Sequence, residues 1–172
     1  MSISGVQSLE RRLNELSEYS VRQAVASGIE KVRSTAVFLC PGESGELRQS
    51  IYTQVEERGG IVTGTCYTNK AYAIYVEFGT GPKGMRSHEG ISPDVAVSYS
   101  TSPWWIHESM IDKALAEKYH WFKINTRNGI FYQCSGQEAQ PFMYPAMKNN
   151  KEELIDGIRA DFQAYIKELT NK

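Results

Sequence analysis

Residues 50–68 read SIYTQVEERGGIVTGTCYT, two alternating runs on either side of a glycine pair. Successive side chains of a strand point to opposite faces, so alternate residues such as Ile51 and Val55 would share one face. The glycine pair can adopt the left-handed backbone that a two-residue turn requires. The stretch therefore predicts an antiparallel hairpin with strands over residues 50–57 and 61–68.

Helices are predicted on both sides of this hairpin. Before it, apolar residues recur at steps of three and four over residues 6–39, which indicates one long helix. Gly28 lies inside that helix and is expected to bend or break it, because glycine weakens a helix interior. After the hairpin, an amphipathic pattern over residues 146–169 predicts a closing helix, with Pro145 in its first turn.

The stretch between the first hairpin and the closing helix mixes short elements. Residues 72–78 (YAIYVEF) predict either a third strand or a short helical turn, because the run is too short to show a period. Residues 83–101 are loop-like, and residues 102–119 predict a short helix. Asn128-Gly129 lies between two further alternating runs, which predicts a second hairpin.

Strands grouped between helices, without regular alternation, favour an α+β fold. We expect an antiparallel β-sheet packed against a long N-terminal helix and a C-terminal helix, with an inserted short helix and β-hairpin. The length of 172 residues fits one domain, residues 1–172, with residues 83–135 as an insertion within it.

The composition is that of an ordinary globular chain with balanced charge. Nineteen basic and twenty acidic residues give a formal charge of −1, whereas phosphate-binding proteins usually carry a basic excess or stripe. A nucleic-acid-binding module therefore remains only an alternative. The three cysteines, Cys40, Cys66 and Cys134, form no CxxC pair and are expected to be reduced thiols. No stretch reaches the ~18 apolar residues of a membrane span.

No catalytic, metal-binding or cofactor-binding set emerges from the sequence. None of the three histidines pairs with another at metal-ligand spacing on a helix, and nucleophile-elbow and phosphate-loop patterns do not occur. The alternative is a small enzyme that uses His107, Glu108 and Asp112 for acid–base or metal chemistry. We expect no cofactor and no enzymatic activity.

Aromatic residues make up 11% of the chain and gather in two regions. Adjacent aromatics on a strand point to opposite faces, so one of each pair should face outward. Exposed Trp and Tyr are enriched at protein interfaces. The interface candidates are Trp104, Trp105, Trp121 and Phe131.

Three blocks, occurring in this order, resemble a known family. They are GELRQSI at residues 45–51, YAIYVEFGTG at residues 72–81 and AQPFMYPA at residues 139–146. Together they are similar to the head–tail joining, tail-completion and minor tail proteins of long-tailed phages (siphophages) and prophages. The residues that carry the resemblance are Leu47, Arg48, Ser50, Tyr72, Tyr75, Val76, Glu77, Phe78, Gly79, Thr80, Pro141, Phe142 and Pro145.

The resemblance implies a structural virion protein that assembles as a ring at the phage neck, between head and tail. Its partners would be further copies of itself and neighbouring neck or tail proteins, with no sequence-specific nucleic acid and no membrane. It would be made in the host bacterial cytoplasm and reside in the virion. A tail terminator or minor tail component is the alternative. The insertion at residues 83–135 is longer than the family's usual link, and insertions often carry partner specificity.

The blocks also permit predictions about single residues. Glu77 is expected on the edge of a strand, either paired with an arginine such as Arg48 or solvated. Pro141 and Pro145 would stiffen the approach to the last helix. The expected contact faces are the long N-terminal helix, the strand carrying residues 72–78 and the insertion.

Overall fold

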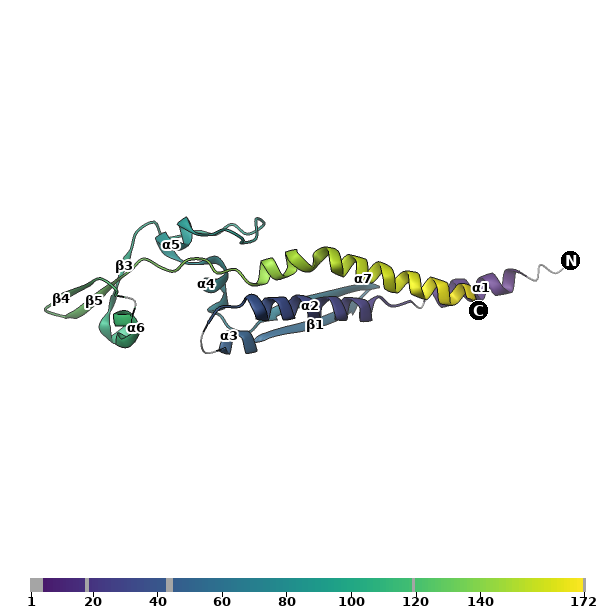
Figure 1. Cartoon of the computed structure of the whole chain (residues 1–172), viewed down its shortest axis with the longest axis horizontal. Coiled ribbons are helices and arrows are strands. Elements are labelled where there is room, and N and C mark those ends of the chain that lie inside the picture. Colours follow the sequence, from purple (N-terminus) through teal and green to yellow (C-terminus); the bar gives the residue numbers. More distant parts are fainter. Residues whose placement is uncertain (1–4, 18, 43–44, 119, 172) are drawn as a thin grey trace. The chain divides into compact units, whose positions relative to one another are not determined.

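The computed structural model describes residues 5–17, 19–42, 45–118 and 120–171 (Figure 1). The chain divides into two compact units. One comprises the residues up to 69 together with those from 146 onward, and the other comprises residues 70–145. The α+β class is confirmed, with helices and antiparallel strands in both units.

The first unit holds a two-stranded sheet covered by helices. Its elements are α1 (Val6–Ser17), α2 (Arg22–Leu39), α3 (Glu46–Gln49), β1 (Ile51–Arg58), β2 (Ile61–Thr68) and most of the closing helix α7 (Met143–Asn171). Figure 1 shows α2 lying over the hairpin, with α7 beside α2.

The first predicted hairpin is confirmed. β1 and β2 pair antiparallel in register from Ile51 opposite Thr68 to Arg58 opposite Ile61. Gly59 and Gly60 both have positive φ, 58° and 79°. Two positive φ values in a two-residue loop define a type I′ turn, whose twist matches that of the flanking strands.

The core of this unit lies between α2 and one face of the hairpin. Ile29, Val32 and Ala36 of α2 are buried, and so is Ile51 at the start of β1. Gly64 of β2 lets α2 approach closely, since a Cβ there would lie 2.9 Å from Val25 and 3.2 Å from Ile29.

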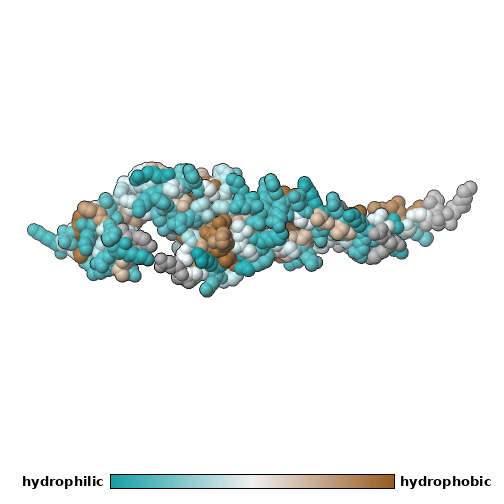
Figure 2. All heavy atoms as spheres, in the orientation of Figure 1, coloured by the Kyte–Doolittle hydropathy of each residue, from teal (hydrophilic) through white to brown (hydrophobic). Residues whose placement is uncertain are grey.

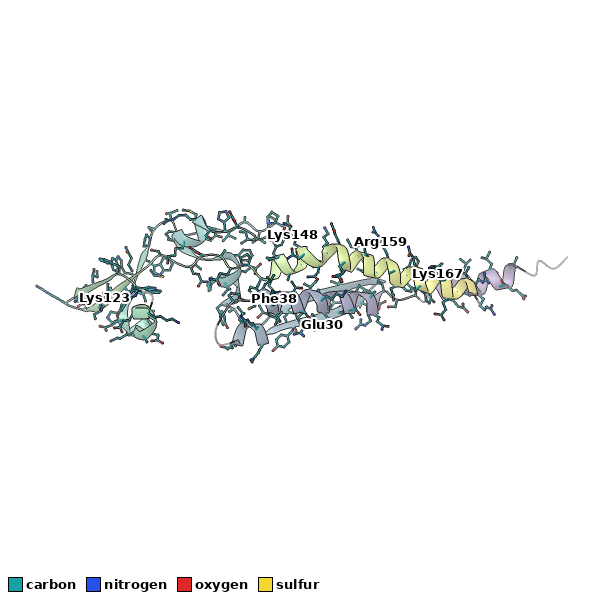
Figure 3. The ribbon with its side chains drawn as sticks, in the orientation of Figure 1. Glu30, Phe38, Lys123, Lys148, Arg159 and Lys167 are labelled. Atoms are coloured by element: carbon teal, nitrogen blue, oxygen red, sulfur yellow. The ribbon has the colours of Figure 1, made fainter. Side chains whose placement is uncertain are left out.

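A polar contact also joins α2 to the hairpin. The Glu30 carboxylate, labelled in Figure 3, accepts a hydrogen bond of 3.0 Å from the Thr53 hydroxyl of β1. It also pairs with Arg33 one turn later on the same helix. A hydrogen bond of this kind helps to fix the orientation of α2 on the sheet, because it is directional and apolar packing is not.

The prediction of one long N-terminal helix is wrong. The chain forms α1 and α2, and it leaves the helix before Arg22 rather than at Gly28. Tyr19 lies in the break, with its ring centroid 5.0 Å from those of Phe162 and Tyr165 on α7, and its hydroxyl donates to Asp161. Packing of this tyrosine on α7 accompanies the break, and the Arg22 amide donates to the Ser20 hydroxyl over 3.3 Å where α2 begins.

Gly28 has a different role from the one expected. It is buried inside α2, and a Cβ at this position would lie 2.7 Å from Leu154 Cγ of α7. The glycine therefore permits close approach of two helices. The closing helix itself is confirmed, but it begins at Met143, three residues before the predicted start, with Pro145 in its first turn.

The second unit contains short helices and a three-stranded sheet. Its elements are α4 (Ala73–Phe78), α5 (Gly81–Arg86), β3 (Trp104–His107), the 3₁₀ helix η1 (Glu108–Met110), α6 (Lys113–Lys118), β4 (Lys123–Thr126) and β5 (Gly129–Cys134). The strand order is β3-β5-β4, and both pairs are antiparallel.

Several predictions for this unit need correction. Residues 73–78 form α4 with Tyr72 before it, so the helical alternative holds and the strand is wrong. The helix predicted over residues 102–119 is wrong in its first half, which contains β3, paired with β5. The second half contains α6, and residue 119 lies outside the described residues. Residues 83–86 belong to α5 rather than to a loop, whereas residues 87–103 are irregular. The second hairpin, β4 and β5, is confirmed.

Candidate assembly interface

The second and third sequence blocks lie side by side in the unit formed by residues 70–145. The amide of Gln140 donates to the carbonyl of Val76 over 2.8 Å. Thr80 and Gln137 exchange two further bonds, in which the Thr80 amide donates to the Gln137 carbonyl and the Gln137 amide donates to the Thr80 hydroxyl. The chain entering α7 is thus held against α4 and the turn that follows it.

Glu77 caps the amino end of α7. Its Oε2 accepts the amides of Phe142 and Met143 at 2.7 and 2.9 Å, and its Oε1 accepts the amide of Tyr144 at 3.0 Å. A helix leaves about four amino-terminal donors without an intrahelical acceptor. At the start of α7 these four positions are residues 142–145. The Glu77 carboxylate accepts the first three amides, and Pro145 has no amide proton, so no donor is left without an acceptor. The negative charge also opposes the positive end of the helix dipole.

The prediction of a solvated Glu77 on a strand edge is therefore wrong. Glu77 lies in a helix and is only 6% exposed, so it is not a solvated charge on a strand edge. Within its own unit the Glu77 carboxylate accepts three backbone amides, and the Arg48 Nε donates to the Cys40 carbonyl over 2.7 Å. A buried carboxylate needs hydrogen-bond donors, and the helix terminus supplies them.

Gly79 and Phe142 have structural roles in the same unit. Gly79 has a φ of 71°, and a Cβ there would lie 2.7 Å from the Ala139 amide nitrogen and 2.8 Å from the Gln137 carbonyl oxygen. Only glycine fits this approach. The Phe142 side chain is fully buried, and Pro141 beside it is half-buried.

The first block closes the open end of the first hairpin. Leu47 is buried, and the Ser50 hydroxyl donates to its carbonyl. The same hydroxyl bonds to the Thr68 hydroxyl at 2.6 Å, which ties the start of β1 to the end of β2. Most residues that carry the family resemblance thus maintain the fold, and contacts with partners must come from exposed residues.

Two exposed motif residues lie on α4 or immediately before it. Tyr72 and Tyr75 are exposed, as is Ile74 between them, and the Tyr75 side chain is 56% exposed. Ile74 and Tyr75 border a groove of about 320 Å³, whose far side is the irregular segment 95–100. Val76 and Phe78 are half-buried. Tyrosines of this kind combine apolar area with a polar end, as interfaces prefer.

Three of the four aromatic interface candidates divide between the two faces of the second sheet, and Trp121 precedes β4. The strand register places Trp105 and Phe131 on one face, with the Trp105 ring 6.0 Å from that of Phe122. Trp104 lies on the other face, where a Cβ at Gly81 would lie 2.7 Å from its ring. Trp121 is half-buried beside Ala116 and Tyr132. Participation of these four residues in an interface stays a prediction.

Phe38 was missed by the sequence reasoning. It lies near the carboxyl end of α2 and is 84% exposed. Figure 2 shows a brown patch at this end of α2, where Figure 3 labels Phe38. The sequence did indicate this exposure, because Phe38 lies outside the apolar stripe of the helix. A large aromatic side chain that is not on the buried face of a helix points to solvent.

The alternative catalytic residues are engaged in local structure. The His107 ring bonds to Ser109 Oγ at 2.7 Å and to the Asn128 carbonyl at 2.9 Å. Glu108 forms an ion pair with Lys113 at 2.6 Å and accepts the Ile130 amide. The hydrogen bond from Lys113, followed by that from Ile130, lowers the pKa of Glu108 below its ordinary value.

Asp112, the third member of that set, accepts the Ala114 amide at 2.9 Å, within the first turn of α6. Within residues 5–17, 19–42, 45–118 and 120–171, no group of three or more His, Cys, Asp or Glu side chains could hold a metal ion. Cys40, Cys66 and Cys134 are reduced cysteines, and burial raises the pKa of the Cys66 thiol. None of the described helices is both long and apolar enough to cross a membrane.

Comparison with protein families confirms the resemblance inferred from the sequence blocks. Residues 5–79 match the model of the HK97-gp10-like family, described as "Bacteriophage HK97-gp10, putative tail-component". The match covers α1 to α4 and therefore includes the first block and most of the second. Comparisons with curated proteins and with solved structures give no significant match.

Proposed function

We propose that this chain is a structural virion protein that joins head to tail, or completes the tail, by assembling as a ring at the phage neck. The observation that carries the proposal is the family match over residues 5–79, which identifies this part of the chain as similar to a phage tail component. Copies of the chain and neighbouring neck or tail proteins would be its partners, and the virion its location.

The geometry of the motif residues supports a structural role. Glu77, Gly79 and Phe142 are buried and hold α4, the following turn and the start of α7 in one arrangement. The exposed residues around them, such as Tyr75, present apolar area suited to protein contacts. A ring with cyclic symmetry joins two different faces of each subunit, so it needs at least two such surfaces.

We propose no enzymatic activity and no cofactor for this protein. Support comes from the His107 ring and the Glu108 carboxylate, which are bonded to a backbone carbonyl and a backbone amide of the neighbouring hairpin. Sequence-specific recognition of nucleic acid is not part of the proposal, because the charges nearly balance.

We further propose that the whole chain acts as one subunit, in which residues 83–135 select the neighbouring protein. The candidate surface is the open face of the second sheet, where Trp105 and Phe131 lie with Phe122. Loops and insertions commonly carry such specificity while the remaining fold is retained.

Complementation in vitro tests the proposed function. Heads and tails are prepared separately from a phage lacking this gene, mixed with the purified chain, and scored for joined particles by electron microscopy and for infectivity. Joining that depends on the added chain is the expected result. Heads and tails that join equally well without the chain would contradict it, and tails of uncontrolled length in the deletion strain would assign tail termination instead.

A further inference from the structure

Both strands of the first hairpin are edge strands. Among the described residues this sheet consists of β1 and β2, each eight residues long and paired over its full length. An edge strand presents a row of backbone donors and acceptors to which another strand can add. A two-stranded sheet of this kind therefore has two such edges, one on β1 and one on β2.

The turn determines which backbone groups point outward. In a type I′ hairpin the residues flanking the two-residue loop, here Arg58 and Ile61, form a hydrogen-bonded pair, and bonded and non-bonded pairs then alternate. Residues 62, 64 and 66 of β2 belong to non-bonded pairs, so their amides and carbonyls point away from β1. Residues 53, 55 and 57 of β1 likewise direct theirs away from β2.

A hydrogen bond in the structure agrees with this assignment. The carbonyl of Val55, on the outer edge of β1, accepts a bond of 3.1 Å from the exposed guanidinium of Arg22. The donor to the Val55 carbonyl is therefore a long, exposed side chain. The backbone amide of an added strand could replace the Arg22 guanidinium with little loss of free energy, because one hydrogen bond is exchanged for another.

The composition of β2 leaves its edge open to another strand. Natural edge strands are commonly protected by charged residues or proline. Residues 61–68 contain no Asp, Glu, Lys, Arg or Pro, whereas β1 ends with Glu56, Glu57 and Arg58. Pairing β2 with a second β1 therefore brings no like charges together, while pairing two β1 edges would place glutamates of both copies in the same sheet.

We infer that the β2 edge of one copy pairs with the β1 edge of the next copy, so that the hairpins form a continuous antiparallel sheet around the assembly. This inference rests on the proposed ring. The contact joins two different edges, and repeating it uses both edges of every subunit. Closing the sheet on itself leaves no free edge.

Strand direction is consistent with this arrangement. Rotation about an axis roughly parallel to the strands preserves their directions, so β1 and β2 alternate up and down from copy to copy and every pair is antiparallel. The same rotation keeps α2 on one face of the sheet in every copy. The opposite face carries Tyr52 and Tyr67, whose rings lie 5.9 Å apart. Pairing two β2 edges would instead give a closed dimer and leave β1 unpaired.

Photo-cross-linking inside the assembled particle tests the inference without knowledge of the register. A benzophenone amino acid replaces the exposed Thr65 of β2, and matched particles carry it at the exposed Gln163 of α7. The expected product of the Thr65 probe is a dimer of the chain in which the probe is attached to residues 51–58 of another copy. A mixture of isotopically light and heavy chains separates this product from cross-links within one chain. Attachment to another copy's β2, to a different protein, or to no other chain would overturn the inference.

A pair of variants tests the backbone bond itself. Val62→Pro removes an outward amide donor but no hydrogen bond of the hairpin, whereas Val62→Ala makes a similar change in the side chain and keeps the donor. With both variants folded by circular dichroism, Val62→Pro should yield about tenfold fewer joined particles than Val62→Ala, because proline blocks strand addition. Equal yields would contradict strand addition at this edge.

The inference and the proposed function fail differently. If joining requires the chain but the Thr65 probe never reaches another copy's β1, only the strand pairing is wrong. If heads and tails join without the chain, the proposed neck role is wrong, whatever the cross-links show.

Discussion

At the scale of single residues, Glu77 has the largest expected effect on stability. Glu77→Ala would leave the amides of Phe142, Met143 and Tyr144 without their acceptor, at about 1–3 kcal/mol for each donor that water cannot reach. We expect the free energy of unfolding to fall by about 3 kcal/mol or more. Glu77→Gln keeps one carbonyl acceptor and should lose about half as much. Urea unfolding followed by circular dichroism measures both.

The control for this experiment is Glu138→Ala, which removes an exposed carboxylate from the segment that leads to α7. Its effect should lie within about 0.5 kcal/mol of zero. If Glu77→Ala lowered the free energy of unfolding no more than Glu138→Ala does, capping of α7 by Glu77 would not stabilise the protein. The structural role that we assign to Glu77 would then be wrong.

Glu108 gives a prediction about pH. Its pKa lies below the ordinary value of 4.5, because the hydrogen bonds from Lys113 and Ile130 favour the carboxylate. The resulting stability is present above pH 4.5 and is lost as the pH falls through the lower pKa of the folded state. Titration of Glu108 by NMR should show the lowered pKa, and Lys113→Met should move it back toward the ordinary value. An unchanged pKa in Lys113→Met would show that the ion pair has no such effect.

At the scale of elements, two glycines in helices should respond in opposite ways to the same substitution. Gly157 of α7 has no atom within 4 Å of a Cβ, so Gly157→Ala should raise stability by about 0.5–1 kcal/mol through helix propensity. Gly28→Ala gains the same propensity but places its Cβ 2.7 Å from Leu154 Cγ, and we expect a net loss of about 1 kcal/mol. Thermal unfolding of both variants measures the difference.

Adding Leu154→Ala to Gly28→Ala should relieve the clash, so the two substitutions together should cost less than the sum of their separate effects. Strict additivity, or stabilisation by Gly28→Ala alone, would contradict the close packing of α2 on α7.

The elements that the sequence predicts well are those with local causes. Both hairpins follow from glycine-containing turns between alternating runs, and the closing helix follows from its long apolar stripe. The errors have distant causes. The break before Arg22 accompanies the packing of Tyr19 against Phe162, and the helix Ala73–Phe78 accompanies the contact of Glu77 with the start of α7. In both contacts the two residues are far apart in the sequence, so a local sequence pattern does not reveal them.

At the scale of the whole molecule, the candidate site could be predicted only in part. The blocks identified Glu77, Gly79 and Phe142 as residues that matter, but their roles required partners about 60 residues away in the sequence. Trp105 and Phe131 were expected at an interface from composition alone, and the strand register now places them on the same face. The open edge of β2 emerged only with the tertiary structure, because strand pairing is a property of the folded chain. The exposure of Phe38 was overlooked, although its position outside the apolar stripe of α2 indicated it.

The central claim is that this chain joins or completes the neck of a phage particle. Electron microscopy of particles from the parent phage with this gene deleted tests it most directly. We predict filled heads and finished tails that lie apart, restored to whole particles when the gene is supplied in trans. Intact, infectious particles in the absence of the chain would contradict the account.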